Sequence, residues 1–355
     1  MKAWEDKIRR VTPYVPGEQP KKPVIKLNTN ECPYPPSPAV KEVLESMDTT
    51  YLRLYPDTEA TALAKALALT YGINEDQIFI GVGSDDVLAM AFMTFFQGKK
   101  PILFPDITYS FYDVWAELFR IPYEKIPLDA EFHLVRENYY KENGGVIFPN
   151  PNAPTGIAEN LDFIRDILVH NQDVIVIVDE AYIDFAEKPS AIELLKEFEN
   201  LLVVQTFSKS RAMAGMRIGY AFGSKELIHA MKDIKYSFNS YTMNMAAQAA
   251  GTAAVLDQKY FESTVEKVVE TRKRTADCLK KLGFVFPESE ANFIFASHKT
   301  VPAKQLYEEL KKRDIYVRYF NKPRIDNYLR ITIGTDEQME HLITALEEIL
   351  DEANR

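Results

Sequence analysis

The stretch TFSKSRAMAGMR at residues 206–217 places Lys209 directly after Ser208 and follows it, eight positions later, with Arg217. It comes after the run LLVVQ at 201–205, which has the length and composition of a buried strand. Lys209 is therefore predicted to lie just beyond the carboxyl end of a strand. An isolated Ser-Lys pair is usually a polar surface loop, so the role of this lysine depends on the rest of the chain.

Short apolar strands alternate with amphipathic helices on both sides of this stretch. The first pair is QIFIGVG followed by SDDVLAMAFMTFF, at residues 77–96. The alternation continues through PILFP, SFYDVWAELFR, IPYEKIPL, GGVIFPN, NLDFIRDILVHNQ, VIVIVDEAY, LLVVQTF and MRIGYAF. This order predicts an α/β fold with a mostly parallel central sheet covered by helices on both faces. Such sheets bind ligands at the carboxyl ends of their strands.

Longer helices replace the alternation beyond residue 220, and the one at 260–283 is long enough to bridge two domains. The remaining segments, including FVFPESEANFIFAS, IYVRYF and YLRITIG, predict a second, smaller α+β unit. A chain of 355 residues is also longer than one core usually supports. We therefore expect an N-terminal arm at 1–28, a large α/β domain that holds the cofactor at 29–274, and a small C-terminal domain at 275–355.

Composition narrows the class of function. A net charge of −10 without a concentrated basic patch argues against nucleic acid or an anionic membrane surface as a partner. No apolar run approaches the ~20 residues needed to cross a bilayer. The five histidines lack HxH or HExxH spacing, so no metal site is expected. Cys32 and Cys278 lie far apart in the sequence, which favours a reduced, cytoplasmic protein. The charge balance favours small molecules as its partners.

Polar and charged residues that could bind a ligand lie at several of the predicted strand ends. In GVGSDD, at 81–86, Ser84 and Asp85 open a helix whose free N–H groups favour a phosphate. The third glycine of GxGxxG and a following GKS or GKT are missing, which disfavours a dinucleotide fold and a P-loop. Asp179 ends a run of five aliphatic residues, where a carboxylate is costly without a cationic partner. Tyr182 could point into the same cleft.

One ligand accounts for these groups together. A phosphate at 83–85 would also be held by Thr206, Ser208 and Arg217. A carboxylate facing a protonated ring nitrogen, a phenol near a ring oxygen and the amine of Lys209 forming a Schiff base describe pyridoxal 5'-phosphate. The cofactor expected for this chain is therefore pyridoxal phosphate.

The motifs VTPY, LNTNE, LYPD, GVGSDD, ITYSFY, PNAPTG, VDEAY, TFSKSRAMAGMRIGY and LRITIG occur in this order over nearly the whole chain. Through this ordered set of motifs the chain resembles the class II, fold-type I pyridoxal-phosphate aminotransferases, and most closely the histidinol-phosphate aminotransferase family. The resemblance implies that Lys209 carries the cofactor, that Asp179 pairs with its pyridine nitrogen and that Tyr182 hydrogen-bonds its phenolic oxygen.

The same resemblance implies further cofactor contacts. Tyr109, in ITYSFY, would stack on the ring, while Ser84 and Asp85 would offer backbone N–H groups to the phosphate. Tyr55, in LYPD, matches the tyrosine that reaches the cofactor phosphate of the neighbouring subunit. A homodimer is therefore expected.

The chain departs from the family at one position. The family's turn usually reads Asn-Pro-Thr-Gly, with an asparagine that hydrogen-bonds the ring oxygen, but Ala153 precedes Pro154 here. Either Tyr182 makes this contact alone, or Asn152 or Asn150 compensates through a shifted turn. The loss of one hydrogen bond to an anionic oxygen costs roughly 1.5–3 kcal/mol.

The resemblance also suggests how substrates bind. Arg330, in LRITIG, matches the arginine that binds the α-carboxylate of glutamate, and a bidentate guanidinium suits that group. Arg318 and Tyr14 match positions that contact the phosphate of histidinol phosphate. Arg318 could instead be a solvated strand residue, and Tyr14 could merely pack the arm. The expected amino-group pair is 2-oxoglutarate and glutamate.

Other functions remain open from the sequence. An aromatic amino-acid aminotransferase shares almost every motif, and the many tyrosines could line either pocket. A Cα decarboxylase of a phosphorylated substrate would use the same scaffold. A non-catalytic cofactor-binding regulator would need a DNA-binding segment or a basic stretch, and neither is found. The missing GxGxxG weakens a nicotinamide dehydrogenase.

Overall fold

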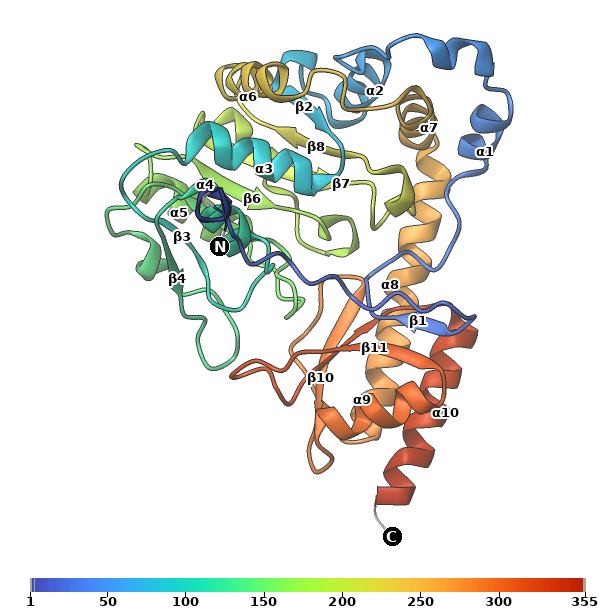
Figure 1. The fold of residues 1–355 in the computed structure, drawn as a ribbon. Helices are drawn as coiled ribbons and strands as arrows, with labels where there is room; N and C mark the ends of the chain where they lie inside the picture. Colours follow the sequence, from blue (N-terminus) through green and yellow to red (C-terminus); the bar gives the residue numbers. More distant parts are fainter. Residues whose placement is uncertain (1, 3, 354–355) are drawn as a thin grey trace.

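The computed structural model describes residue 2 and residues 4–353, so residues 1, 3, 354 and 355 of the predicted arm and small domain lie outside the described residues. Two sheets organise the chain, and a long helix, α8 (Gln258–Lys281), runs from one to the other (Figure 1). The larger sheet has helices on both faces, and the smaller one packs against helices from the C-terminal part of the chain (Figure 1).

The larger sheet has seven strands within the described residues. In spatial order they are β2 (Ile78–Gly81), β8 (Gly219–Phe222), β7 (Leu201–Thr206), β6 (Val176–Asp179), β5 (Val146–Pro149), β3 (Ile102–Pro105) and β4 (Tyr123–Ile126). The strands from β7 to β4 run parallel, and β8 runs antiparallel to both β7 and β2. The predicted α/β class with a mostly parallel sheet is confirmed.

Alternate residues of the inner strands are buried on opposite faces of this sheet, whereas the edge strand β4 exposes Glu124 and Lys125. In β6, Val176 and Val178 belong to one core and Ile177 to the other, which is why the strand reads as continuously apolar. One face packs against α2 (Thr61–Tyr71), α5 (Leu161–His170) and α7 (Met245–Leu256). The other face packs against α3 (Ser84–Phe95), α4 (Tyr112–Phe119) and α6 (Lys225–Phe238).

Side-chain caps fix where several helices begin. Ser224 accepts a hydrogen bond from the Leu227 N–H at the start of α6, and Asn244 accepts one from the Ala247 N–H at the start of α7. Such caps satisfy N–H groups that have no intrahelical partner and contribute about 1 kcal/mol each. The helix α3 lacks a side-chain cap, so its first N–H groups are available to a ligand.

The smaller sheet draws on both ends of the chain. Its order is β1 (Ile25–Leu27), β11 (Ile315–Tyr319), β12 (Leu329–Thr332), β10 (Phe293–His298) and β9 (Phe284–Val285). Its core is shared with α8, α9 (Ala303–Lys312) and α10 (Asp336–Ala353). Since β1 pairs with β11, the end of the expected arm contributes a strand to the small domain. The division into arm, large domain and small domain stays a proposal, and α8 crosses its boundary at 274/275.

Arg272 on α8 links a segment of the large sheet to a segment of the small one. Its side chain is buried, and Nη1 donates hydrogen bonds to the carbonyl oxygens of Phe185, at 3.1 Å, and Ala291, at 2.6 Å. Phe185 follows β6 of the large sheet, whereas Ala291 precedes β10 of the small one. The guanidinium therefore holds the segment after β6 against the segment before β10.

The sequence left some elements unassigned. The helices α1 (Pro38–Glu45) and α2 and the strand β1 were not expected, whereas the strands and helices from β2 to α10 occur where the pattern placed them. No helix in the described part of the chain combines the length and apolar character of a membrane span.

Candidate active site

The predicted cofactor residues meet at one edge of the large sheet. The parallel strands β5, β6 and β7 end there, and the N-terminus of α3 faces the same cavity of about 160 Å³. Nine predicted residues line it: Ser84, Asp85, Tyr109, Asp179, Tyr182, Thr206, Ser208, Lys209 and Arg217. Residues far apart in the chain thus converge at the carboxyl ends of the strands, as expected for this kind of sheet.

The predicted substrate residues line a second, adjoining cavity, also of about 160 Å³. Tyr14, Arg318 and Arg330 lie there, and Tyr109, Tyr182 and Lys209 line both cavities. Tyr55 lines neither. The structure therefore brings together every predicted site residue except Tyr55.

Asp179 is a buried carboxylate with one free oxygen. Its Oδ2 accepts a hydrogen bond of 2.7 Å from the hydroxyl of Tyr112, while Oδ1 is buried without a partner. Burial raises the pKa of Asp179 to about 6, although the hydrogen bond from Tyr112 works in the opposite direction. An orphaned carboxylate oxygen at the cavity wall fits a cationic or protonated group of a ligand.

An anion site lies around the first turn of α3. The guanidinium of Arg217 lies 3.4 Å from Ser208 Oγ and 3.1 Å from Asp85 Oδ2, and the hydroxyls of Thr206 and Ser208 are 3.0 Å apart. The N-terminus of α3 adds free N–H groups at Ser84 and Asp85 and the positive end of the helix dipole. Two hydroxyls, a guanidinium and a helix N-terminus together suit a phosphate.

Two glycines allow these groups to approach one another. Gly83, with φ of 86°, lies against the Arg217 guanidinium, and a Cβ there would overlap it. A Cβ on Gly219 would overlap the backbone of Gly83 and Ser84. The close packing of β8 on the start of α3 therefore requires glycine at both positions.

Lys209 and Tyr182 lie next to each other at the junction of the two cavities. Nζ of Lys209 donates a 3.2 Å hydrogen bond to the carbonyl oxygen of Thr29 and lies 5.6 Å from the centre of the Tyr182 ring. The Tyr182 ring packs edge-on against Phe293 of the small domain, with centroids 5.1 Å apart. The lysine amine is therefore within reach of a ligand in either cavity.

The Tyr182 hydroxyl accepts a 2.9 Å hydrogen bond from Nδ2 of Asn30. Asn30 is in turn held by Thr332 and Asn292, which belong to or adjoin strands of the small sheet. The motif LNTNE had pointed to this segment without assigning a role to either asparagine. The structure adds Asn30 to the candidate site.

The asparagines of the turn at 150–156 do not take the place of the missing one at 153. Asn152 Nδ2 donates to the Ile107 carbonyl oxygen at 3.0 Å and to Thr155 Oγ1 at 3.1 Å. Asn150 bonds both ways with the backbone of Glu159. Their amide groups stabilise the turn and its neighbouring loop, and neither bonds to Tyr182.

The second cavity concentrates positive charge. Arg318 and Arg330 are directly opposite each other on β11 and β12, and both guanidiniums lie 5.6 Å from the ring of Phe320. Nη2 of Arg330 donates to the Asn28 carbonyl oxygen at 3.1 Å, while its Nε is buried without a partner. None of the described residues that line this cavity is acidic. The cavity thus suits an anionic ligand.

The arm forms one wall of the second cavity. Tyr14 stacks on Phe111 with ring centroids 4.2 Å apart and lies 6.4 Å from the ring of Tyr109. At Gly17 the arm passes close to Thr29 and Arg318, with no room beside Thr29 for a Cβ. Tyr14 therefore both packs the arm and faces the cavity, which makes it a wall residue on geometric grounds.

Tyr55 lies on the surface, away from both cavities. Its side chain is 79% exposed, and its ring stacks on Tyr241 with centroids 4.3 Å apart. Other large apolar side chains exposed in the same two segments are Tyr51, Leu52, Leu54, Tyr236 and Phe238. We call these residues, with Tyr55 and Tyr241, the aromatic patch. A patch of this kind is typical of a protein interface.

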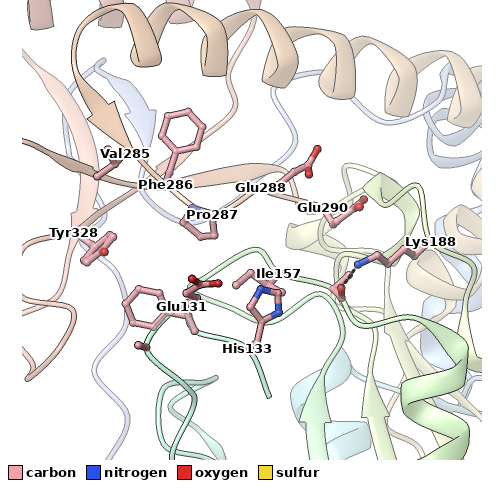
Figure 2. A pocket seen from close by; sticks show the side chains of 13 residues that line it. Glu131, His133, Ile157, Lys188, Val285, Phe286, Pro287, Glu288, Glu290 and Tyr328 are labelled. Atoms are coloured by element: carbon pink, nitrogen blue, oxygen red, sulfur yellow. Dashed lines mark hydrogen bonds between the residues drawn. The ribbon is translucent and has the colours of Figure 1, made fainter. Parts of the chain in front are cut away.

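A wider cavity of about 520 Å³ lies between the domains but away from these residues (Figure 2). Two of its polar side chains are already engaged: Lys188 bonds the Ala158 carbonyl oxygen, and His133 lies 3.3 Å from Glu159. No predicted site residue lines it. The buried, converging polar groups lie in the two smaller cavities, so we place the candidate active site there.

Sequence reasoning missed three residues of the site. Tyr112 was part of ITYSFY, but its bond to Asp179 depends on α4 packing over the sheet. Asn30 and Phe320 come from segments that meet the site only when the small domain docks. For Tyr112, the available signal was a buried carboxylate that needed a hydrogen-bond donor.

Proteins of similar sequence and fold are aminotransferases. The family model of class I and II aminotransferases matches residues 22–346. A histidinol-phosphate aminotransferase of Clostridium beijerinckii is 51% identical over 350 residues, which cover 98% of each chain.

Two solved structures share the fold. The histidinol-phosphate aminotransferase of Clostridium acetobutylicum has a TM-score of 0.85 at 24% identity, over 93% of this chain and 100% of that one. The enzyme of the same name from Sinorhizobium meliloti, solved in complex with pyridoxal-5'-phosphate, has a TM-score of 0.84 at 23% identity, over 93% and 91% of the two chains. From the family match and the 51% identity, the chain belongs to the class I and II aminotransferase family, within the group of histidinol-phosphate aminotransferases.

Proposed function

We propose that this protein uses pyridoxal 5'-phosphate to transfer an amino group between histidinol phosphate and 2-oxoglutarate. The observation that carries the proposal is the orphaned Oδ1 of Asp179, which is buried at the wall of a cavity that also holds Lys209 and an anion site. A ligand with a protonated ring nitrogen, a reactive aldehyde and a phosphate matches all three features.

The residues fit this cofactor group by group. Ser84, Asp85, Thr206, Ser208 and Arg217 would hold the phosphate at the start of α3. Asp179 would keep the ring nitrogen protonated, and Tyr182 would donate to the ring oxygen. Tyr109, whose hydroxyl bonds Asp85 at 2.7 Å, would lie against the ring.

When bound, the cofactor supplies an electron sink for the charge that develops as the substrate Cα–H bond breaks. Lys209 Nζ lies at the junction of the two cavities and is placed to take the Cα proton as general base. Tyr182 and the Thr29 carbonyl oxygen confine the lysine amine to this position. Asp179, buried at the end of β6, would stabilise the proton on the ring nitrogen and so support the electron sink.

The charge of the second cavity supports a phosphorylated substrate. Arg330 would bind the α-carboxylate of glutamate, and Arg318 with Tyr14 would bind the phosphate of histidinol phosphate. Three cationic side chains and no acidic one suit a substrate of high negative charge better than a neutral aromatic side chain. The aromatic rings of Tyr14, Tyr109 and Phe320 leave an aromatic amino-acid aminotransferase as the second candidate.

We also propose a homodimer formed through the aromatic patch. Tyr55 is too exposed to serve its own site, and a partner subunit would bury it against the phosphate end of the neighbouring cavity.

Neither Cys32 nor Cys278 forms a disulfide, which supports a reducing, cytoplasmic location.

The test of this function is a single-turnover titration of the cofactor-loaded protein, followed by loss of the cofactor's visible absorption band. Histidinol phosphate is expected to react at a concentration about 100-fold lower than phenylalanine, because only the former engages the second arginine. Equal or better reaction with phenylalanine would withdraw the phosphate role of Arg318 and favour the second candidate.

A further inference from the structure

We propose that Asn30 is a positioning residue that turns the hydroxyl of Tyr182 toward the ring oxygen of the cofactor. The inference rests on the proposed pyridoxal-phosphate site. Ala153 has no side-chain donor for that oxygen, so the direction of the Tyr182 hydroxyl matters more in this chain, and Asn30 sets it.

Every polar group of Asn30 has a partner. Its backbone N–H donates to Thr332 Oγ1 at 3.0 Å, and its carbonyl oxygen accepts from Asn292 Nδ2 at 3.0 Å. Its Oδ1 accepts from the Thr332 hydroxyl at 3.0 Å, and its Nδ2 donates to the Tyr182 hydroxyl at 2.9 Å. The residue is 1% exposed and has φ of 57°, a left-handed conformation that asparagine tolerates. Asn30 is therefore rigidly held.

The network also fixes which way the amide of Asn30 faces. The hydroxyl of Thr332 accepts from the backbone N–H of Asn30, so its single proton goes to Oδ1. Nδ2 is then left to face Tyr182. The phenol oxygen accepts that hydrogen bond, and its own proton stays available for an acceptor in the cavity that Tyr182 lines.

This arrangement strengthens the one phenol that remains for the ring oxygen. A hydroxyl that accepts a hydrogen bond becomes a better donor, because chains of hydrogen bonds polarise one another. A donor to the ring oxygen stabilises negative charge there and so favours the deprotonated form of the lysine-bound cofactor. Loss of the Asn30 amide is expected to move the pH midpoint of the cofactor's visible absorption band upward.

The experiment compares Asn30→Ala, Asn30→Asp and Asn143→Ala. Asn143 is a matched control: it is a buried asparagine bonded to Asn171, Lys141 and Gly145, and it lines neither cavity. The measurements are the pH midpoint of the visible band and the dissociation constant of pyridoxal phosphate by equilibrium dialysis.

The three variants are expected to differ in how far they move the pH midpoint of the visible band. Asn30→Ala should raise the midpoint by about 0.5–1 pH unit and weaken cofactor binding about 3- to 10-fold. Asn30→Asp should have a larger effect, because its carboxylate would draw the Tyr182 proton away from the cavity. Asn143→Ala should lower stability without moving the midpoint. Apart from the carboxylate that Asn30→Asp introduces, the variants leave unchanged the charged and titratable groups that line the cavities with Tyr182. These are Tyr14, Glu31, Asp85, Tyr109, Asp179, Lys209, Arg217, Arg318 and Arg330.

A double-mutant cycle separates positioning from general structural support. In a Tyr182→Phe background, Asn30→Ala should add no further shift of the midpoint, since its effect passes through the hydroxyl. A second shift of equal size, or an unchanged midpoint in Asn30→Ala alone, would overturn the inference. If Asn30→Ala does not fold, Thr332→Val replaces it and should give a smaller upward shift. A wild-type protein without a visible band would overturn the proposed function itself.

Discussion

The hydroxyl of Tyr112 donates a 2.7 Å hydrogen bond to Oδ2 of Asp179 and leaves Oδ1 buried with no partner. Tyr112 comes from α4, on one face of the large sheet, and Asp179 ends β6. The pair therefore fixes the carboxylate at the strand end while leaving half of its hydrogen-bonding capacity for a ligand.

The stability of the cofactor-free protein should depend on the pH through Asp179. Its pKa is about 6 when folded and 3.8 in its ordinary state, so the unfolded chain ionises first as the pH rises. Folding stability is then lost between these values, by roughly 2 kcal/mol from pH 4.5 to pH 7.5. Asp179→Asn removes this loss. Denaturant unfolding at both pH values measures how Asp179→Asn changes the free energy of unfolding. The change should be more favourable at pH 7.5 than at pH 4.5, and equal changes would contradict the raised pKa of the buried carboxyl.

Arg217 should recognise the phosphate rather than the ring. Arg217→Ala is expected to weaken binding of pyridoxal phosphate about 100-fold, because it removes a charge-assisted contact. Binding of pyridoxal, which lacks the phosphate, should change by less than about 3-fold. Equilibrium dialysis with both ligands makes the comparison, and an equal loss for the two would place Arg217 elsewhere in the site.

Arg318 should discriminate substrates by their phosphate. Arg318→Gln is expected to raise KM for histidinol phosphate roughly 50-fold, since a charged hydrogen-bonding partner is lost. The kcat/KM for unphosphorylated histidinol should stay within about 3-fold of the original value. Steady-state kinetics with the two substrates test the anchor role, and parallel losses would argue for a structural one.

Tyr55 should act in the partner's site. Tyr55→Phe is expected to weaken cofactor binding in its own homodimer, and Lys209→Ala should prevent retention of the cofactor. Mixing the two variants under subunit exchange would pair an intact Lys209 with an intact Tyr55 in one site of each heterodimer. Recovery of wild-type cofactor affinity in that site is expected; no recovery would mean that Tyr55 does not serve the neighbouring subunit.

Arg272 should hold the two domains together. Arg272→Leu leaves the carbonyl oxygens of Phe185 and Ala291 without their shared donor and is expected to cost roughly 2–4 kcal/mol of stability. Arg274→Leu, two residues along the same helix, is the control, because it removes exposed ion pairs with Asp336 and Glu270 and a hydrogen bond to Thr271 but no contact with Phe185 or Ala291. Urea unfolding of both variants would detect the difference, and comparable losses would contradict the bridging role.

Much of the fold could be predicted because its strands are buried on both faces. Runs such as VIVIVD and LLVVQ read as strands without ambiguity, and the helices between them have clear polar faces. The helices α1 and α2 and the strand β1 escaped because the proline-rich segment before α1 obscures periodicity and β1 is three residues long. Its pairing with β11, about 290 residues away in the chain, has no local signal.

The cofactor-facing residues were predictable for a related reason, since a parallel sheet gathers its strand ends at one edge. Asn30 and Tyr112 were not, because their roles depend on which donor reaches a given oxygen after the layers have packed. The alanine at 153 was visible in the sequence, but its consequence was not. Only the packed structure reveals that Asn150 and Asn152 are engaged elsewhere and that Asn30 bonds to Tyr182.

The most direct test of the central claim is to trap the bound cofactor on its lysine. Borohydride reduction of the pyridoxal-phosphate-loaded protein, followed by proteolysis and peptide mass spectrometry, identifies the modified residue. The account predicts stoichiometric label on Lys209 and none on Lys209→Ala. Label on another lysine, or no stable label on a protein that still transfers amino groups, would contradict it.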